Sequence, residues 1–217
     1  GDQGLARGEG GRDGRRLREV RGRKVAVART HRHAVGFADR LMGDDPEREE
    51  QVADHAAQGG ELLQVLAAED RDVGLDAHRT VYTFAGPADA VVQGCVNLIE
   101  GATQLIDMRA HHGTHPRIGA VDVCPIVALR PEEAALADQA AEKVAQLLHD
   151  LPAGGWFYSR NARRPEFRLL ANVRKGQYEG VEARQSTFDF GTYHPSFGAM
   201  ALGARDFLLA YNVNLSA

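Results

Sequence analysis

Residues 105–119, LIDMRAHHGTHPRIG, form a segment rich in histidine and arginine. Three histidines, two arginines and an aspartate surround a turn that Gly113 and Pro116 favour, and the apolar segment 118–129 follows directly. Histidine side chains have an ordinary pKa of about 6.5, so they can give and take a proton near neutral pH. Because reactive groups are often carried on the loops of a rigid scaffold, the segment predicts a functional loop that leads into a strand.

Strong helix and strand signals lie around this turn. β-forming residues at 81–84 predict a strand, and Gly86 and Pro87 end that strand and begin a helix over 87–105. Apolar residues at three- and four-residue spacings predict one buried stripe on this helix, made of Val91, Cys95, Leu98, Ala102 and Leu105. The turn therefore joins a helix to the strand predicted over 118–129.

A second helix and two further strands are predicted after that strand. Pro131 opens an amphipathic helix that ends at 152–155, and short strands are predicted over 156–158 and 207–213. The expected buried residues of this helix are Leu136, Ala140, Val144, Leu147 and Leu148. Strands that alternate with two long helices predict an α+β sandwich, in which the helices cover one face of a mixed or antiparallel sheet.

The first part of the chain carries weaker signals. Residues 1–22 are rich in glycine and arginine and poor in apolar side chains, which predicts a disordered tail. A short strand is expected over 24–28. Pro46, followed by acidic residues, begins a predicted helix that ends near Glu69 and is interrupted by glycines at 59–60.

The composition argues against several classes of function. A formal net charge of −4 and a pI near 6.1 give no general attraction to nucleic acid or to anionic membranes, so neither is expected as a partner. The sequence shows no signal peptide and no apolar run of the roughly 20 residues that a membrane-spanning helix needs, which predicts a cytoplasmic protein. Cys95 and Cys124 fall in apolar patterns and are expected to be buried free thiols.

The three histidines of the turn allow more than one interpretation. His111 and His115 have the spacing of ligands on one helix face, but Gly113 and Pro116 disfavour a helix, and too few other ligands are in view for a zinc site. No metal is therefore expected. An alternative is that all three, His112 among them, are exposed loop histidines without a functional role.

One carboxylate and two guanidinium groups flank these histidines. Asp107 can fix the tautomer of a neighbouring imidazole and favour its charged form. Arg109 and Arg117 can hold a substrate carboxylate with two parallel hydrogen bonds. A surface ion pair is the alternative for Arg117.

Six segments between residues 79 and 215 resemble the amino-terminal subdomain of the glutamate formimidoyltransferase family, which in animals is fused to a cyclodeaminase. They occur in the order of the family and run nearly continuously along the chain. The segments are 79–84 (RTVYTF), 105–108 (LIDM), 115–125 (HPRIGAVDVCP), 175–179 (KGQYE), 189–191 (DFG) and 211–215 (YNVNL).

The resemblance implies a ferredoxin-like sandwich and a transferase activity. The implied reaction moves a formimino group from formiminoglutamate to tetrahydrofolate and gives 5-formiminotetrahydrofolate and glutamate, within histidine degradation and one-carbon metabolism. Tetrahydrofolate is then a co-substrate, and no metal is required. The implied partners are these small molecules, and a homo-oligomer is compatible with the resemblance.

The resemblance also assigns roles to individual residues. His115 occupies the position of the family's catalytic histidine, and Arg117, Asp107 and Arg109 beside it are the expected substrate-binding residues. The loop 189–198 lies where the family contacts folate. Its expected folate-binding residues are Asp189, Gly191, Tyr193, His194, Phe197 and Gly198.

Three parts of the chain are expected: a disordered tail at 1–22, the subdomain at 23–208, and the beginning of a truncated second subdomain at 209–217. Residues before His78 do not resemble the family's opening strand and its PNFSEG loop. A second interpretation is therefore a non-catalytic folate-binding module or structural remnant of the family, because ligand sites commonly lie at domain interfaces. A third is an incomplete gene product whose first residues are not native to the fold.

Overall fold

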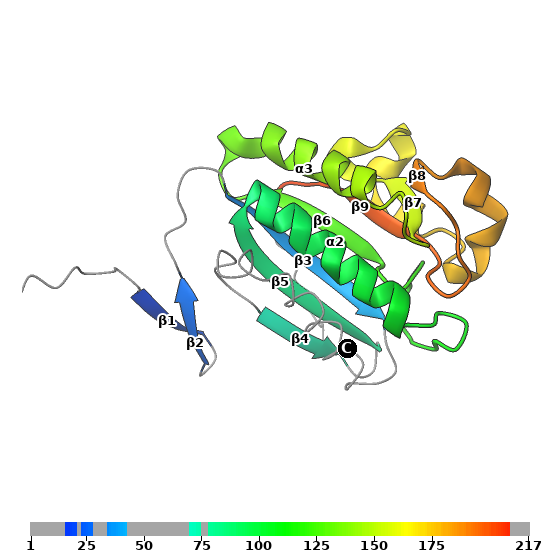
Figure 1. Ribbon diagram of the computed structural model, residues 1–217, viewed down its shortest axis with the longest axis horizontal. Helices are drawn as coiled ribbons and strands as arrows, with labels where there is room; N and C mark the ends of the chain where they lie inside the picture. Colours follow the sequence, from blue (N-terminus) through cyan, green and yellow to red (C-terminus); the bar gives the residue numbers. More distant parts are fainter. Residues whose placement is uncertain (1–15, 21–22, 28–33, 43–69, 75–77, 209–217) are drawn as a thin grey trace, which may run out of the picture.

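The computed structural model describes residues 16–20, 23–27, 34–42, 70–74 and 78–208. Its main feature is a sheet of seven strands in the order β4-β5-β3-β6-β9-β7-β8, with two long helices against one face (Figure 1). A separate two-stranded sheet pairs β1 (Arg16–Val20) with β2 (Arg23–Val27) in antiparallel orientation.

The large sheet is mixed, which confirms the predicted α+β class. Four strands form its antiparallel half: β4 (Asp70–Gly74), β5 (Arg79–Pro87), β3 (Ala34–Met42) and β6 (Val123–Ala128). The other half continues from β6 with parallel β9 (Met200–Ala204) and β7 (Gly154–Phe157) and ends with antiparallel β8 (Phe190–Gly191). The strand predicted over 118–129 is thus shorter than expected, and its first residues belong to the loop before β6.

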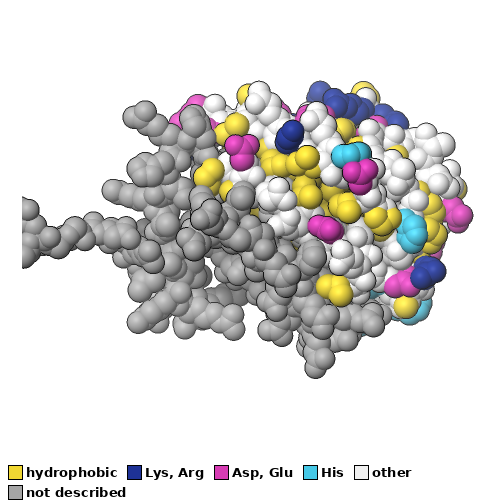
Figure 2. Space-filling model, in the orientation of Figure 1, with side chains coloured by type: hydrophobic (Ala, Val, Ile, Leu, Met, Phe, Trp, Pro, Cys, Tyr) yellow, Lys and Arg dark blue, Asp and Glu magenta, His cyan; other side chains and the backbone are white. Residues whose placement is uncertain are grey.

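The helices α2 (Ala88–Leu105) and α3 (Ala134–Leu147) pack side by side on the same face of the sheet (Figure 1). The stripe predicted for the first helix is confirmed from Val91 to Ala102, whose side chains are buried in the core between helices and sheet, and its last residue, Leu105, is partly buried. Before α3, the 3₁₀ turn η3 (Pro131–Glu133) begins at the proline that predicted the helix start. In the space-filling view, hydrophobic side chains also gather on the outer surface over these two helices (Figure 2).

The buried row of α3 agrees with the predicted row at Ala140, Val144 and Leu148, whereas Leu136 is only partly buried. The row consists of Ala137, Ala140, Ala141, Val144, Ala145 and Leu148. Leu147 was expected in this row, but its side chain is 37% exposed. Each step along an α-helix turns about 100°, so the residue before Leu148 points away from the sheet.

A second layer covers the opposite face of the sheet at β6, β9 and β7. Because side chains alternate along a strand, Phe157 points into the core under the helices, whereas Trp156 and Tyr158 point into a second hydrophobic cluster. The second cluster is covered by short turns: η4 (Ser159–Asn161), η5 (Pro165–Arg168), α4 (Leu170–Val173), η6 (Tyr178–Gly180) and η7 (Glu182–Thr187). The sequence patterns did not predict this layer.

Several sequence predictions fall at the ends of the chain. The strand expected over 24–28 is confirmed as β2, and part of the expected tail, Arg16–Val20, forms β1. The helix expected from Pro46 to Glu69 lies outside the described residues. Of the strand predicted over 207–213, only the first two residues are described and neither is in a strand, whereas β9 was not predicted.

Two predictions about composition can be compared with the structure. Cys95 and Cys124 are both buried thiols and are not joined in a disulfide, as predicted. Within the described part of the chain, no helix is long and apolar enough to cross a membrane.

Candidate functional site

The candidate site lies where two loops meet, which we call the histidine loop (residues 106–122) and the 193–199 loop. The histidine loop connects α2 to β6, and its backbone is bonded to the other loop at three points. Met108 N–H donates to the Ser196 carbonyl at 2.8 Å, and Ala120 N–H donates to Phe197 at 2.8 Å. Ala199 N–H donates back to the Ile118 carbonyl at 2.9 Å. Residues separated by about 80 positions are therefore held in a fixed geometry.

Glycines allow the two loops to approach this closely. Gly119 and Gly198 form a bridge between the loops. A Cβ atom on Gly198 would lie 2.4 Å from the Ile118 carbonyl oxygen, and its φ of +78° is one that side-chain-bearing residues rarely adopt. A Cβ atom on Gly119 would lie 2.2 Å from the Ala199 carbonyl oxygen. Gly198, expected to contact folate, thus has a structural reason to be glycine.

Arg117 is buried beneath this junction, with only 6% of its surface exposed. It donates Nη2 to Glu179 Oε1 at 2.7 Å and Nη1 to Glu179 Oε2 at 3.1 Å. Its Nη1 also reaches Gln177 Oε1 at 3.3 Å, and its Cζ lies 5.8 Å from the centre of the Tyr178 ring. The hydrogen bonds from Arg117 hold the pKa of the Glu179 carboxyl below its ordinary value. The two-point contact of Arg117 is therefore made with a carboxylate of the protein itself, Glu179, which corresponds to the ion-pair alternative given for this residue.

His111 is also buried, and its ring is held on both sides. Its Nε2 lies 3.1 Å from the His78 carbonyl oxygen, and Arg117 Nε donates to its Nδ1 at 3.4 Å. A carbonyl oxygen only accepts hydrogen bonds, so Nε2 carries the proton and Nδ1 is left to accept one. The two contacts are therefore consistent with a neutral imidazole that helps to pack the loop.

His115 has a different environment from His111. It is half-buried, and its Nδ1 lies 2.8 Å from the Pro116 carbonyl oxygen. Since the carbonyl can only accept, Nδ1 is the protonated nitrogen, and Nε2 is the basic nitrogen of the neutral ring. His112 is exposed. The structure thus separates three histidines that the sequence presents together.

Asp107 and Arg109 form a bidentate pair at the rim of the site. Arg109 donates Nε to Asp107 Oδ1 at 2.8 Å and Nη2 to Oδ2 at 2.6 Å. These hydrogen bonds, opposed in part by burial, hold the pKa of Asp107 below its ordinary value. A smaller contribution comes from His194, which places the 193–199 loop close to this carboxylate.

The residues expected to bind folate separate into two groups. Asp189 accepts hydrogen bonds from Phe157 N–H at 2.9 Å and Arg164 Nη1 at 3.1 Å, so both of its oxygens support the edge of the sheet. Gly191 lies in β8, and Phe197 is completely buried.

Tyr193 and His194 are the two whose side chains reach the surface beside the site. Tyr193 is half-buried and His194 is exposed. The imidazole Nδ1 of His194 lies 2.8 Å from Ser196 Oγ, and the Tyr178 hydroxyl donates to the Pro195 carbonyl at 2.7 Å. These two contacts hold the loop in place, and the side chains of Tyr193 and His194 stay accessible from the solvent.

Sequence reasoning gave no role to Gln177, Tyr178 and Glu179, although the segment 175–179 was one of the six that carried the family resemblance. Their polar atoms hold Arg117 and the 193–199 loop in place. The presence of an amide and an acid on one short turn was the available signal. In the part of the chain that the structure describes, no three His, Cys, Asp or Glu side chains gather closely enough to hold a metal ion.

Comparison with known proteins identifies the family of this chain. Residues 43–205 match the model of the formiminotransferase domain, N-terminal subdomain. This chain belongs to the formiminotransferase family. The family resemblance is thereby confirmed, and five of the six segments lie within the match, whereas 211–215 lies beyond its end. The match includes the histidine loop, the Arg117–Glu179 pair and the 193–199 loop.

Formiminotransferase relatives occur in animals, bacteria and archaea. Formimidoyltransferase-cyclodeaminase of Rattus norvegicus is 40% identical over 155 residues, which cover 67% of this chain and 28% of the relative. Glutamate formimidoyltransferase of Streptococcus pyogenes serotype M1 is 37% identical over 145 residues, covering 64% of this chain and 48% of the relative. The protein of the same name from Thermoplasma acidophilum is 32% identical over 185 residues, covering 80% and 59%. The chain thus spans between 28% and 59% of these relatives.

Proposed function

We propose that this chain transfers a formimino group from formiminoglutamate to tetrahydrofolate, giving 5-formiminotetrahydrofolate and glutamate. The relatives are named glutamate formimidoyltransferase, which supports transfer of a formimino group in a reaction that involves glutamate. The acceptor rests on the resemblance of the loop 189–198 to the folate loop of the family. Tetrahydrofolate is a co-substrate in this reaction.

The contact between His115 and the Pro116 carbonyl oxygen is the observation that carries the proposal. Its Nδ1 is committed to the Pro116 carbonyl at 2.8 Å, so Nε2 is the nitrogen that can accept a proton. A general base needs this property, and a half-buried position on a fixed loop is where such a base is effective.

The reaction requires one group that first accepts and then returns a proton. A new bond forms between the pterin ring nitrogen and the amidine carbon, and the attacking nitrogen loses its proton to His115 Nε2. The bond from the same carbon to the glutamate nitrogen then breaks, and the departing nitrogen takes that proton from His115. Proton transfer of this kind contributes roughly a hundred- to ten-thousand-fold, and the alignment of two substrates contributes the rest.

The neighbouring groups fit binding roles on the two sides of His115. Arg109 is 64% exposed, and its hydrogen bonds to Asp107 use Nε and Nη2. In this proposal, its Nη1 binds a substrate carboxylate. Arg117 acts indirectly, because Glu179 occupies its fork. Tyr193 and His194 form the surface against which the pterin ring lies.

The proposal is tested by the transfer assay with three single variants. His115→Ala is expected to lower turnover at least about a hundredfold without a large loss of stability, because its contribution is to proton transfer. His112→Ala is the matched control, since His112 is exposed on the same loop, and its turnover should stay near wild type. His111→Ala removes a packed ring, so its main expected effect is a lower free energy of unfolding.

The outcomes separate the interpretations. Equal losses for His112→Ala and His115→Ala would contradict a specific proton-transfer role for His115. A wild-type chain that binds tetrahydrofolate without transferring the formimino group would favour the non-catalytic binding module.

A further inference from the structure

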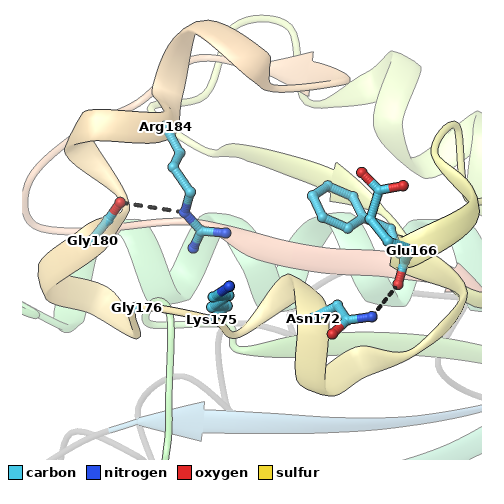
Figure 3. Close-up of a pocket in the computed structure, with 7 residues that line it drawn as sticks. Glu166, Asn172, Lys175, Gly176, Gly180 and Arg184 are labelled. Atoms are coloured by element: carbon cyan, nitrogen blue, oxygen red, sulfur yellow. Dashed lines mark hydrogen bonds between the residues drawn. The ribbon is translucent and has the colours of Figure 1, made fainter.

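A pocket of about 490 Å³ lies within the layer of short turns that covers Trp156, away from α2 and α3 (Figure 3). Its side-chain lining comes from Glu166, Phe167, Asn172, Lys175 and Arg184. None of these residues belongs to the histidine loop or to the 193–199 loop. The volume falls in the range of sites that bind small molecules.

Arg184 enters this pocket with its guanidinium fixed in place. It donates Nε to the Gly180 carbonyl at 3.3 Å and Nη1 to the Val173 carbonyl at 3.1 Å. Its Cζ lies 4.4 Å from the centre of the Trp156 ring. The remaining nitrogen, Nη2, is buried and has no hydrogen-bond partner among the described residues. A buried donor left in this way is the kind of group that a bound ligand or ion completes.

Arg184 and Lys175 place positive charge at one end of the pocket, and no carboxylate of the described residues is paired with either of them. Both acceptors of Arg184 are neutral carbonyls, and no described carboxylate forms an ion pair with Arg184 or with Lys175. Burial lowers the pKa of Arg184, since removal from water disfavours the charged form. An anion at this end would offset that cost.

The two ends of the pocket differ in charge. Figure 3 shows the head groups of Arg184 and Lys175 on one side of the opening, and Glu166 and Asn172 on the other. Asn172 is held by a hydrogen bond from its Nδ2 to the Glu166 carbonyl at 2.8 Å. A ligand with one negative charge fits this arrangement better than one with two, because its far end would face Glu166.

We propose that this pocket binds a small organic monoanion, with its carboxylate at Arg184 and Lys175 and a flat apolar body against Phe167. A planar guanidinium recognises a carboxylate through parallel hydrogen bonds, and an aromatic ring offers a flat apolar surface. Inorganic phosphate carries more charge and has no apolar body. Phosphate therefore cannot make the apolar contact with Phe167.

The pocket shares one segment with the candidate site. Gly176 and Gly180 line it, and between them Gln177 and Glu179 hold Arg117 from the other side of the same turn. The binding proposal does not depend on the proposed function. It concerns a separate opening with its own charged groups.

Benzoate is the probe for this site, and Trp156 is the reporter. Trp156 is the one tryptophan of the sequence, and Arg184 lies against its ring, so its fluorescence responds to changes at the guanidinium. Titration of the full chain with benzoate should give a saturable change with a dissociation constant of the order of 1–10 mM, as expected for a ligand of this size. Benzamide, which lacks the charge, and phosphate, which lacks the ring, should give no saturable change over the same range.

Two lysine variants make the experiment specific. Lys175→Gln should weaken benzoate binding about two- to fivefold, because it removes one cation from an exposed position without disturbing the core. Lys143→Gln makes the same change in charge at an exposed position on α3 and should leave binding unchanged.

Arg184→Lys keeps the charge but loses the planar guanidinium, and should abolish saturable binding of benzoate while the circular dichroism spectrum is retained. Absence of saturation with the wild-type chain, equal binding of benzamide, or equal effects of the two lysine variants would overturn the proposal.

Discussion

Arg117 and Glu179 lie 62 residues apart in the sequence, yet they form a bidentate ion pair with N···O distances of 2.7 and 3.1 Å. The guanidinium side chain is 7% exposed and the carboxylate side chain 64% exposed, so Glu179 covers a buried charge from the solvent side. The same guanidinium contacts the ring and the carbonyl oxygen of His111. One ion pair therefore connects the turn at 177–179 to the histidine loop.

Glu179→Gln should lower the free energy of unfolding by about 1–3 kcal/mol, because it leaves the buried Arg117 without its charged partner. Urea denaturation measures this loss. Glu182→Gln, at an exposed position on the next turn, is the control and should change stability by less than about 0.5 kcal/mol. Similar losses in both variants would show that the pair does not contribute specifically.

Stability should fall in acid, and Glu179 should account for part of the fall. Its pKa is held below the ordinary value of 4.5 in the folded chain by hydrogen bonds from Arg117. A carboxyl with a lowered folded pKa stabilises the fold above its unfolded pKa, and this contribution is lost as the pH falls through the folded pKa. The unfolding free energy of the wild-type chain should therefore decrease more steeply below about pH 4.5 than that of Glu179→Gln. Parallel pH profiles for the two proteins would contradict this assignment.

Gly198→Ala should destabilise the fold by at least about 2 kcal/mol, since the position combines a positive φ with a Cβ that would collide with the Ile118 carbonyl. Gly180→Ala provides the comparison. A Cβ atom there would meet nothing within 4 Å, so thermal unfolding should show a change within about 0.5 kcal/mol. A small effect of Gly198→Ala would mean that the two loops can separate at little cost.

Cys95→Ser should lower stability by about 1–3 kcal/mol, because it places a hydroxyl in the apolar core between α2 and the sheet. Cys95→Ala buries no hydroxyl and should cost less. In the native wild-type chain, Cys95 should react with a thiol reagent only after unfolding, since its side chain is completely buried. Rapid labelling in the native state would be inconsistent with that burial.

Sequence patterns succeeded where a single element determines the outcome. The spacing of Val91, Cys95 and Ala102 follows the turn of one helix, so the buried face of α2 could be read without knowledge of its partners. The missed strand β9 shows the opposite case. Its sequence, Met200–Ala204, is short and rich in small residues, and it is completely buried between β6 and β7. Its partners on both sides, more than its own propensity, make it a strand.

The amino-acid sequence alone was sufficient to indicate the α+β class, the buried stripe of α2 and the formiminotransferase family, because these depend on local spacing or on motifs in a fixed order. The family resemblance assigned the catalytic position to His115, but no local pattern showed how its environment differs from that of His111, four positions earlier in the same loop. Their difference comes from His78 and Arg117, which hold the ring of His111, and from Glu179, which holds Arg117. Burial and hydrogen bonding between distant segments arise only when the chain is folded, and they determine which imidazole packs the loop and which one presents a basic nitrogen.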